Sequence, residues 1–183
     1  VVRLTRAHGS FTMPARPLVV GAMNPCPCGQ LGATGDLCTC TGDRIGRYRG
    51  RVSGPLVDRF DLQVTVRAVP LSALAGPAAE ATEAVRARVV AARAVQAQRL
   101  APERFETNAE MDIVSLRRHA RVGPATAELI QKAHHRLGFS ARGYHRVLRV
   151  ARTIADLAGD GSISPEHAAE ALQFRELDRP VGA

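Results

Sequence analysis

The sequence predicts a chain in two parts, an α/β part followed by an all-α part, on three observations. Short apolar runs separated by turn residues fill the first third, and apolar residues at helical spacing fill the remainder. Between them, residues 70–77 contain two prolines and Gly76, a composition typical of linkers. We therefore expect a first domain over residues 1–69, a linker and helix over 70–103, and a helical domain over 104–183.

The first part contains the predicted strands. A tight turn at 7–10 joins the first two strands into a hairpin. The run at 17–23 is continuously apolar, which predicts a strand buried on both faces, and it ends at Asn24. The predicted strands are 1–6, 11–15, 17–23 and 62–66.

The second part contains most of the predicted helices. Ser164 as N-cap and Pro165 in the first helical position mark the start of the last one. The helix at 140–157 has two opposite stripes. The stripe expected to pack contains Tyr144, Val147, Ala151 and Ile154, and the stripe expected to be exposed to water contains His145, Arg149, Arg152 and Asp156. The predicted helices are 44–51, 79–100, 111–120, 124–137, 140–157 and 164–174.

Composition excludes two broad classes of protein. With 45% hydrophobic and 23% charged residues the chain is too apolar for a disordered tail. No apolar run approaches the roughly 18 residues that a membrane span needs. The first six residues lack the apolar core of a secretory signal, so we expect a cytoplasmic protein.

The net charge of +8 at pH 7 often accompanies binding to nucleic acid or another polyanion. A basic globular surface without such a partner is the alternative, because every cation except Lys132 is an arginine, a bias that GC-rich coding also produces. Only 4% of the residues are aromatic and none is Trp, so stacking of bases on an aromatic platform is not expected.

The four cysteines fall within fifteen residues, as two Cys-x-Cys pairs: Cys26, Cys28, Cys38 and Cys40. Four thiolates from two short turns can form a closed tetrahedral site for a structural Zn²⁺. The Cys-x-Cys spacing is tighter than the usual Cys-x-x-Cys, and two alternatives stay open: four reduced buried thiols, or a redox pair or disulfides. No histidine base lies adjacent, which disfavours a catalytic cysteine.

Three polar residues stand at the ends of predicted elements. Taken singly, Asn24 reads as a cap at a strand end, Arg59 as a surface residue in a salt bridge, and Arg142 as a cation on a helix face. Arg142 and Arg146 lie in the first turns of their helix, where the helix dipole disfavours cations unless an anion is near. That anion could be a bound phosphate, or a carboxylate such as that of Glu128.

Longer segments around these residues resemble one family. Residues 11–29, together with Arg47-Tyr48 and Ser-Gly-Pro-Leu-Val-Asp-Arg-Phe-Asp at 53–61, are similar to the magnesium-chelatase-like AAA+ ATPases of the ComM/YifB type. Residues 140–157, which begin Ser-Ala-Arg-Gly-Tyr-His, are similar to that family's C-terminal signature. The resemblance covers nearly the whole chain. It implies a bacterial hexameric ATPase that uses ATP and Mg²⁺ to migrate branched DNA during natural transformation.

The resemblance also implies roles for individual residues. Asn24 would be the sensor-1 residue that positions the attacking water, and Arg59 the arginine finger that reaches a neighbouring subunit's nucleotide. Arg142 would be sensor 2, on a helical lid. Arg6 and His8, at the tip of a hairpin inserted before sensor 1, would contact DNA phosphates.

Two expected features of such an ATPase are missing from the sequence. It has no G-x-x-x-x-G-K-[ST] phosphate loop and no apolar strand ending in Asp-Glu to hold Mg²⁺. We therefore expect this chain to be the C-terminal part of the AAA+ core with its helical lid, unable to hydrolyse ATP alone. Two alternatives remain: a chelatase-type ATPase subunit that acts on a protein complex with a porphyrin substrate, and a stand-alone zinc-stabilised module that binds nucleic acid.

Overall fold

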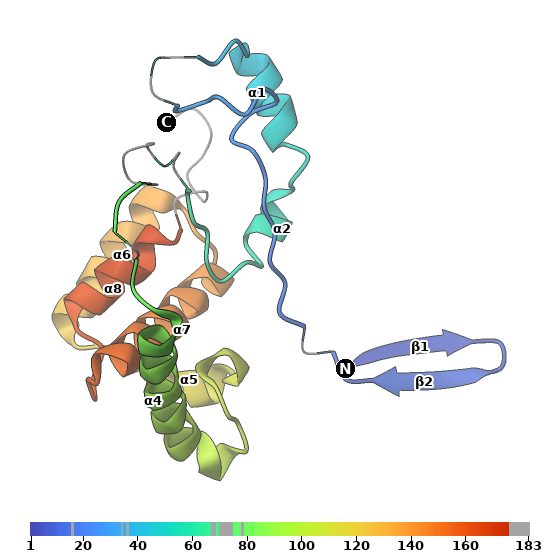
Figure 1. Ribbon diagram of the computed structural model, residues 1–183. Helices are drawn as coiled ribbons and strands as arrows, with labels where there is room; N and C mark the ends of the chain where they lie inside the picture. The colour runs from blue at the N-terminus through green and yellow to red at the C-terminus, as the bar shows by residue number, and fades with distance from the viewer. Residues whose placement is uncertain are drawn as a thin grey trace. The chain divides into compact units, whose positions relative to one another are not determined.

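The computed structural model describes residues 1–15, 17–33, 35, 37–66, 69, 75–77 and 79–175 (Figure 1). The chain divides into two compact units, Val1–Ile45 and Gly46–Ala183, which we describe separately. Strands and α-helices occur in the order β1 (Val2–Arg6), β2 (Gly9–Met13), α1 (Gly42–Arg49), α2 (Gly54–Val57), α4 (Thr82–Leu100), α5 (Ile113–His119), α6 (Pro124–Leu137), α7 (Ala141–Ala158) and α8 (Pro165–Gln173). Two short 3₁₀ turns, η1 (Ala101–Glu103) and η2 (Asn108–Glu110), connect α4 to α5.

A two-stranded antiparallel hairpin forms where the sequence predicts one. The register pairs Leu4 with Phe11 and Thr5 with Ser10, and every strand residue is exposed. Because side chains alternate across a strand, Leu4 and Phe11 lie on one face of the hairpin, and Thr5 and Ser10 lie on the other. The hydroxyl oxygens of Thr5 and Ser10 are 3.3 Å apart.

The strands predicted at 17–23 and 62–66 are absent, which corrects that part of the expected fold. Neither segment forms a strand, and their apolar side chains face solvent, with Leu18 92% exposed and Val66 87% exposed. A buried strand needs hydrogen-bonded neighbours, and the sheet within the described residues contains only β1 and β2. The described chain is therefore mainly helical, with one small two-stranded sheet.

Helices α4 to α8 surround a conventional apolar core. Helix α7 contacts α4, α5 and α8, and α6 contacts α8. Val147 and Ala151, on the predicted packing stripe of α7, are buried as expected, whereas Tyr144 in the first turn of that stripe is 37% exposed. The helix starts also follow the sequence signals: Asp112 and Ser140 accept backbone N–H groups at 2.8 and 3.1 Å, and Ser164 caps α8 ahead of Pro165. The core cluster contains Leu100, Met111, Leu116, Ala120, Ile130, Ala133, Leu137, Phe139, Val147, Leu148, Ala151, Ile163, Ala168 and Ala171.

The expectation that Arg152 and Asp156 are exposed to water is wrong. Arg152 is 2% exposed and Asp156 is 4% exposed. The carboxylate of Asp156 accepts two hydrogen bonds of 2.7 Å from the guanidinium of Arg99, one of 2.8 Å from Asn108 Nδ2 and one of 3.1 Å from Arg152 Nε. Arg99 comes from α4 and Asn108 from η2, so groups that the periodicity of α7 does not reveal stabilise the buried Arg152–Asp156 pair.

The neighbours of Asp156 determine the direction in which its pKa is shifted. Burial raises the pKa of this carboxyl group, but the hydrogen bonds from Arg99 and Asn108 and the charge of Arg152 outweigh burial and lower the pKa. Burial lowers the pKa of Arg152, and the charge of Asp156 opposes this effect. The pair is therefore ionised inside the bundle.

Across the described residues, no helix combines the length and apolar character needed to cross a bilayer.

Candidate metal centre and arginine sites

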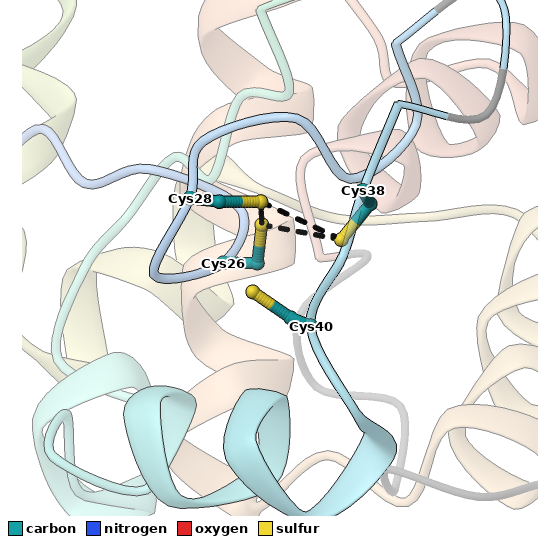
Figure 2. A group of neighbouring side chains, drawn as sticks. All are labelled: Cys26, Cys28, Cys38 and Cys40. Carbon is teal, nitrogen blue, oxygen red and sulfur yellow. Dashed lines mark hydrogen bonds between the residues drawn. The ribbon is translucent and has the colours of Figure 1, made fainter.

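The four cysteines converge at one point in the loop before α1 (Figure 2). The Sγ atom of Cys26 lies 3.3 Å from that of Cys28 and 3.7 Å from that of Cys38. Cys28 and Cys38 are also 3.7 Å apart, and all four sulfurs, Cys40 included, lie within 4.8 Å of one another. Among the described residues this is the only group of His, Cys, Asp or Glu side chains arranged to hold a metal ion.

Local backbone geometry brings the first cysteine pair into this position. Gly29 has a φ of +80°, a conformation that residues with a Cβ rarely adopt, and its N–H donates to the carbonyl of Cys26 at 3.0 Å. The resulting turn directs Cys26 and Cys28 toward the second pair, which lies on the segment leading into α1 (Figure 2). Cys26 is buried, whereas Cys28 is exposed and the second pair is half-buried.

Hydrogen bonds within the cluster separate the pKa values of the thiols. Burial raises the pKa of Cys26, but hydrogen bonds from Cys28 and the backbone of Leu31 outweigh burial and lower the pKa to about 6. The backbone of Cys40 favours the Cys38 thiolate, yet burial and the neighbouring sulfurs raise the pKa of Cys38 to about 12. Four thiolates so close together repel one another, and only a bound cation would stabilise them all in ionised form.

The sulfur positions fit a tetrahedral zinc site. A Zn–S bond of about 2.3 Å implies sulfurs about 3.8 Å apart at the corners of the tetrahedron. The closest sulfur pairs, at 3.3 to 3.7 Å, and the 4.8 Å limit for the whole group bracket that value. The cysteines are free and three of the four are not buried, so a set of buried reduced thiols does not describe the cluster.

The other residues singled out in the first unit lie outside the cluster. Asn24 is exposed two positions before Cys26, and its side chain lies beside the turn at Gly29, 3.8 Å from where a Cβ on that glycine would be. Arg6 and His8 are exposed at the tip of the hairpin, as predicted. Arg59 and Arg142 belong to the second unit.

Arg59 follows the short helix α2. Its Nη1 donates a hydrogen bond of 2.7 Å to the carbonyl of Pro55, and the residue is exposed. The carboxylates on either side of it point to the helical bundle: Asp58 accepts from the hydroxyl of Ser140 at 2.9 and 3.0 Å, and Asp61 pairs with Arg146. Sequence reasoning singled out the run from Asp58 to Asp61 but did not predict that its two carboxylates contact the helical bundle, although carboxylates on both sides of an arginine were a signal.

Arg142 lies in the first turn of α7, within the same unit as Arg59. It is exposed, and no hydrogen bond or ion pair joins it to another described residue. Arg146, one turn later, pairs with Asp61. Glu128 pairs with Lys132 at 2.7 Å instead, so the suggestion that Glu128 neutralises the start of this helix is wrong. The counter-ion of Arg146 comes from the segment that carries Arg59.

Comparisons with known proteins cover both units. The family model for magnesium chelatase, subunit ChlI, matches residues 1–74, and that for the C-terminal region of the same subunit matches residues 79–175. The chain is 38% identical over 178 residues to competence protein ComM of Haemophilus influenzae and 36% identical over 181 residues to the uncharacterized protein YifB of Escherichia coli. It is also 42% identical over 175 residues to an uncharacterized protein of Mycobacterium tuberculosis.

These alignments cover 96 to 97% of the chain and 34% of each relative. The chain therefore spans about a third of the length of the curated relatives it matches. The family resemblance seen in the motifs around Asn24, Arg59 and Arg142 is confirmed over both matched regions. The chain belongs to the magnesium chelatase family, in the group of sequences similar to ComM and YifB.

Proposed function

We propose that this chain supplies the nucleotide-sensing and DNA-contacting part of an ATP-dependent, hexameric motor that migrates branched DNA. The observation that carries the proposal is the likeness to the competence protein ComM along 96% of the chain. The domain boundaries at 69/70 and 103/104 belong to the same proposal, as do the AAA+ core and lid assignments.

The three polar residues have the chemistry that their proposed roles require. Arg59 is exposed, and its guanidinium is always charged and planar, so it can stabilise charge on a transferring phosphoryl group of a neighbouring subunit. Arg142 is exposed without a partner among the described residues, as expected for a cation that meets a phosphate. Asn24 offers an amide, which can orient an attacking water through hydrogen bonds.

DNA binding is assigned to the hairpin. Arg6 and His8 are exposed at its tip, and an arginine there can pair with DNA phosphates. The net charge of +8 supports a polyanionic partner. In this proposal ATP and Mg²⁺ are held mainly by the part of the protein that the relatives have and this chain does not span, since the sequence has no phosphate-loop motif.

Zinc has a structural role in this proposal. Cys26, Cys28, Cys38 and Cys40 would bind one Zn²⁺, which would neutralise the thiolates and fix the loop that follows Asn24. The loop has little apolar burial of its own, so a metal is an efficient way to order it. All four positions would be filled by sulfur, which leaves no open position for catalysis.

A chimaeric protein tests the motor assignment. The part of Haemophilus influenzae ComM that lies outside the alignment is fused to this chain, and ATP hydrolysis is measured with and without forked DNA. We expect hydrolysis stimulated by forked DNA. Arg59→Ala should lower kcat about a thousandfold or more, and Arg59→Lys should not rescue it. Arg93→Ala, at an exposed position of α4, is the matched control and should leave kcat unchanged.

The outcomes separate the alternatives. ATP hydrolysis that is indifferent to Arg59→Ala would overturn the arginine-finger assignment. Hydrolysis that depends on Arg59 and ignores DNA, together with a lack of salt-dependent DNA binding, would favour a chelatase-type subunit that acts on a protein complex. Tight DNA binding by the 183-residue chain alone would favour the stand-alone module.

A further inference from the structure

We infer that Asp58 and Asp61 clamp the segment carrying Arg59 onto the helical bundle, so that Arg59 and Arg142 move together as one rigid body. The inference has two parts. The clamp itself rests only on contacts within the second unit. Its consequence for catalysis rests on the proposed function of the two arginines.

The first half of the clamp is built around Arg175, which is 1% exposed. Its Nη1 donates to the carbonyl of Phe60 at 2.8 Å, and its Nη2 lies 3.3 Å from the carboxylate of Asp58. The same carboxylate accepts the hydroxyl hydrogen of Ser140, the N-cap of α7. One carboxylate therefore links the N-cap of α7 to Arg175, two residues beyond α8, through two hydrogen-bond donors.

The hydroxyl group of Ser140 makes hydrogen bonds both to the backbone of α7 and to Asp58. Its Oγ accepts the N–H of Gly143 at 3.1 Å, which caps α7, and its O–H donates to Asp58 at 2.9 to 3.0 Å. Gly143 allows the close approach of Phe139, because a Cβ there would lie 2.9 Å from Phe139 Cβ, and the same Cβ would be in ordinary contact with Arg175 Nη2 at 3.5 Å. The cap of α7 and the guanidinium of Arg175 therefore meet at the carboxylate of Asp58.

The second half of the clamp is made by Asp61 and the residues around it. Asp61 pairs with Arg146, one helical turn beyond Arg142 on α7. The backbone N–H of Gln63 donates to the carbonyl of Phe174 at 3.0 Å, and Gln63 is buried. Arg59 thus lies between two anchored carboxylates, and both anchors include residues of α7.

The composition of the clamp favours positioning over simple stabilisation. Burying a guanidinium is costly, and an apolar side chain of similar size often gives equal or greater stability at such sites. A hydrogen-bonded fork, in contrast, fixes the direction of the groups that it contacts. Arg175 holds a backbone carbonyl and a carboxylate next to Arg59, so it sets the position of the Arg59 segment more narrowly than apolar packing would.

The clamp has a consequence for the motor. A phosphate bound at Arg142 would pull on the first turn of α7, and the clamp would transmit that displacement to Arg59. Nucleotide sensing in one subunit and the arginine finger directed at its neighbour would then be coupled through a single rigid unit. Asp58, Asp61, Arg146 and Arg175 are positioning residues in this scheme, because they act through Arg59.

Hydrogen exchange on the 183-residue chain tests the clamp directly. The reporter is the segment 56–63, which includes the Gln63 amide that donates to Phe174. We expect Asp61→Arg and Arg146→Asp, each alone, to speed exchange in this segment by about two- to tenfold, the effect of losing one partly exposed ion pair. The double variant, in which the two charges are exchanged, should restore protection.

Two controls keep the test independent of global unfolding. Exchange in α6 and α8 should change little in the single variants, and the exchanged pair Glu128→Lys with Lys132→Glu, on the exposed face of α6, should not alter the segment 56–63. In a further variant, Arg175→Met, the side chain is of similar length but cannot donate hydrogen bonds to Phe60 or Asp58. Exchange at 56–63 should be faster in this variant as well. Unchanged exchange at 56–63 in the single variants, or no recovery in the double variant, would overturn the clamp.

ATP hydrolysis by the chimaera distinguishes failure of the clamp from failure of the proposed role of Arg59. If the clamp and the finger are both correct, Asp61→Arg lowers kcat and the charge-exchanged double variant recovers it. If exchange responds as expected but Arg59→Ala leaves hydrolysis unchanged, the clamp stands and the proposed role of Arg59 fails. If Arg59→Ala abolishes hydrolysis while Asp61→Arg speeds exchange without lowering kcat, the coupling is overturned and the finger stands.

Discussion

The two units of the chain bury very different kinds of surface. Among the described residues of Val1–Ile45 only Cys26 is buried, whereas the second unit has a core of fourteen hydrophobic residues and an internal charged network. Apolar burial contributes about 25 cal/mol for each Å² removed from water, so the helical unit carries its own driving force for folding. The first unit buries almost no apolar surface, so a metal, a partner, or both have to stabilise its ordered structure.

Removing zinc should produce the largest effect, and in one unit only. We expect the purified chain to carry about one Zn²⁺, and a strong chelator to abolish hydrogen-exchange protection around residues 24–41 while the melting temperature of the helical unit stays the same. Cys38→Ser should reproduce the loss, and the neighbouring Thr39→Ser should not. Protein prepared with zinc present that contains no metal would contradict the proposal.

The next largest effect is expected inside the helical unit. Asp156→Asn leaves the guanidinium groups of Arg99 and Arg152 without their shared carboxylate, which should lower the free energy of unfolding by about 3 to 5 kcal/mol. The matched control is Glu128→Gln, which removes an exposed pair and should cost less than about 1 kcal/mol. Chemical denaturation gives both free energies of unfolding. Equal losses in the two variants would show that the buried network contributes no more stability than an exposed ion pair.

A pair of apolar truncations compares the units directly. Ile130→Ala empties a position that is 1% exposed in the helical core and should cost about 2 to 5 kcal/mol. Leu18→Ala removes a side chain that is 92% exposed, and the free energy of unfolding should change by less than about 0.5 kcal/mol. A large loss from Leu18→Ala would mean that this segment is covered in solution, for example by a second copy of the chain.

Acid should weaken the helical unit by a smaller amount. Hydrogen bonding to Ser115 and His119 lowers the pKa of Glu103, and the pKa of Asp156 is also lowered. Because both folded-state pKa values lie below the ordinary ones, their contribution is complete above about pH 5 and is lost as the pH falls through the folded-state values. In thermal melts with a chelator present, the melting temperature should fall between pH 6 and pH 3. It should fall less steeply with pH in Asp156→Asn, which lacks one of the two carboxylates.

Local signals in the sequence predicted local structure well. The hairpin, the cap at Ser164 with Pro165, and the span of α6 are set by residues close to one another in the chain. The cysteine cluster was also predictable, since two Cys-x-Cys pairs nine residues apart need only one loop to meet. These features depend on turn and capping chemistry, which short stretches of sequence encode.

The features that sequence reasoning missed depend on distant partners. Asp58 meets Ser140 and Arg175 across 82 and 117 positions of the chain, and no periodicity points to such contacts. Arg152 and Asp156 were placed in water because the stripe on their helix does not show that Arg99 supplies a second guanidinium. The segment 17–23 was predicted to be buried because its composition is apolar, but burial requires neighbouring strands as well as an apolar segment.

The Lys132–Glu128 pair on α6 has a practical consequence for labelling. Lys132 is the only lysine of the chain, and its side chain is 73% exposed, so amine-reactive dyes and crosslinkers have one side-chain target. A fluorophore attached there would lie on the helical unit without replacing any arginine assigned to nucleotide or DNA. Motion of that unit in the 183-residue chain could then be followed optically from one labelled side chain, with no engineered cysteine to compete for zinc.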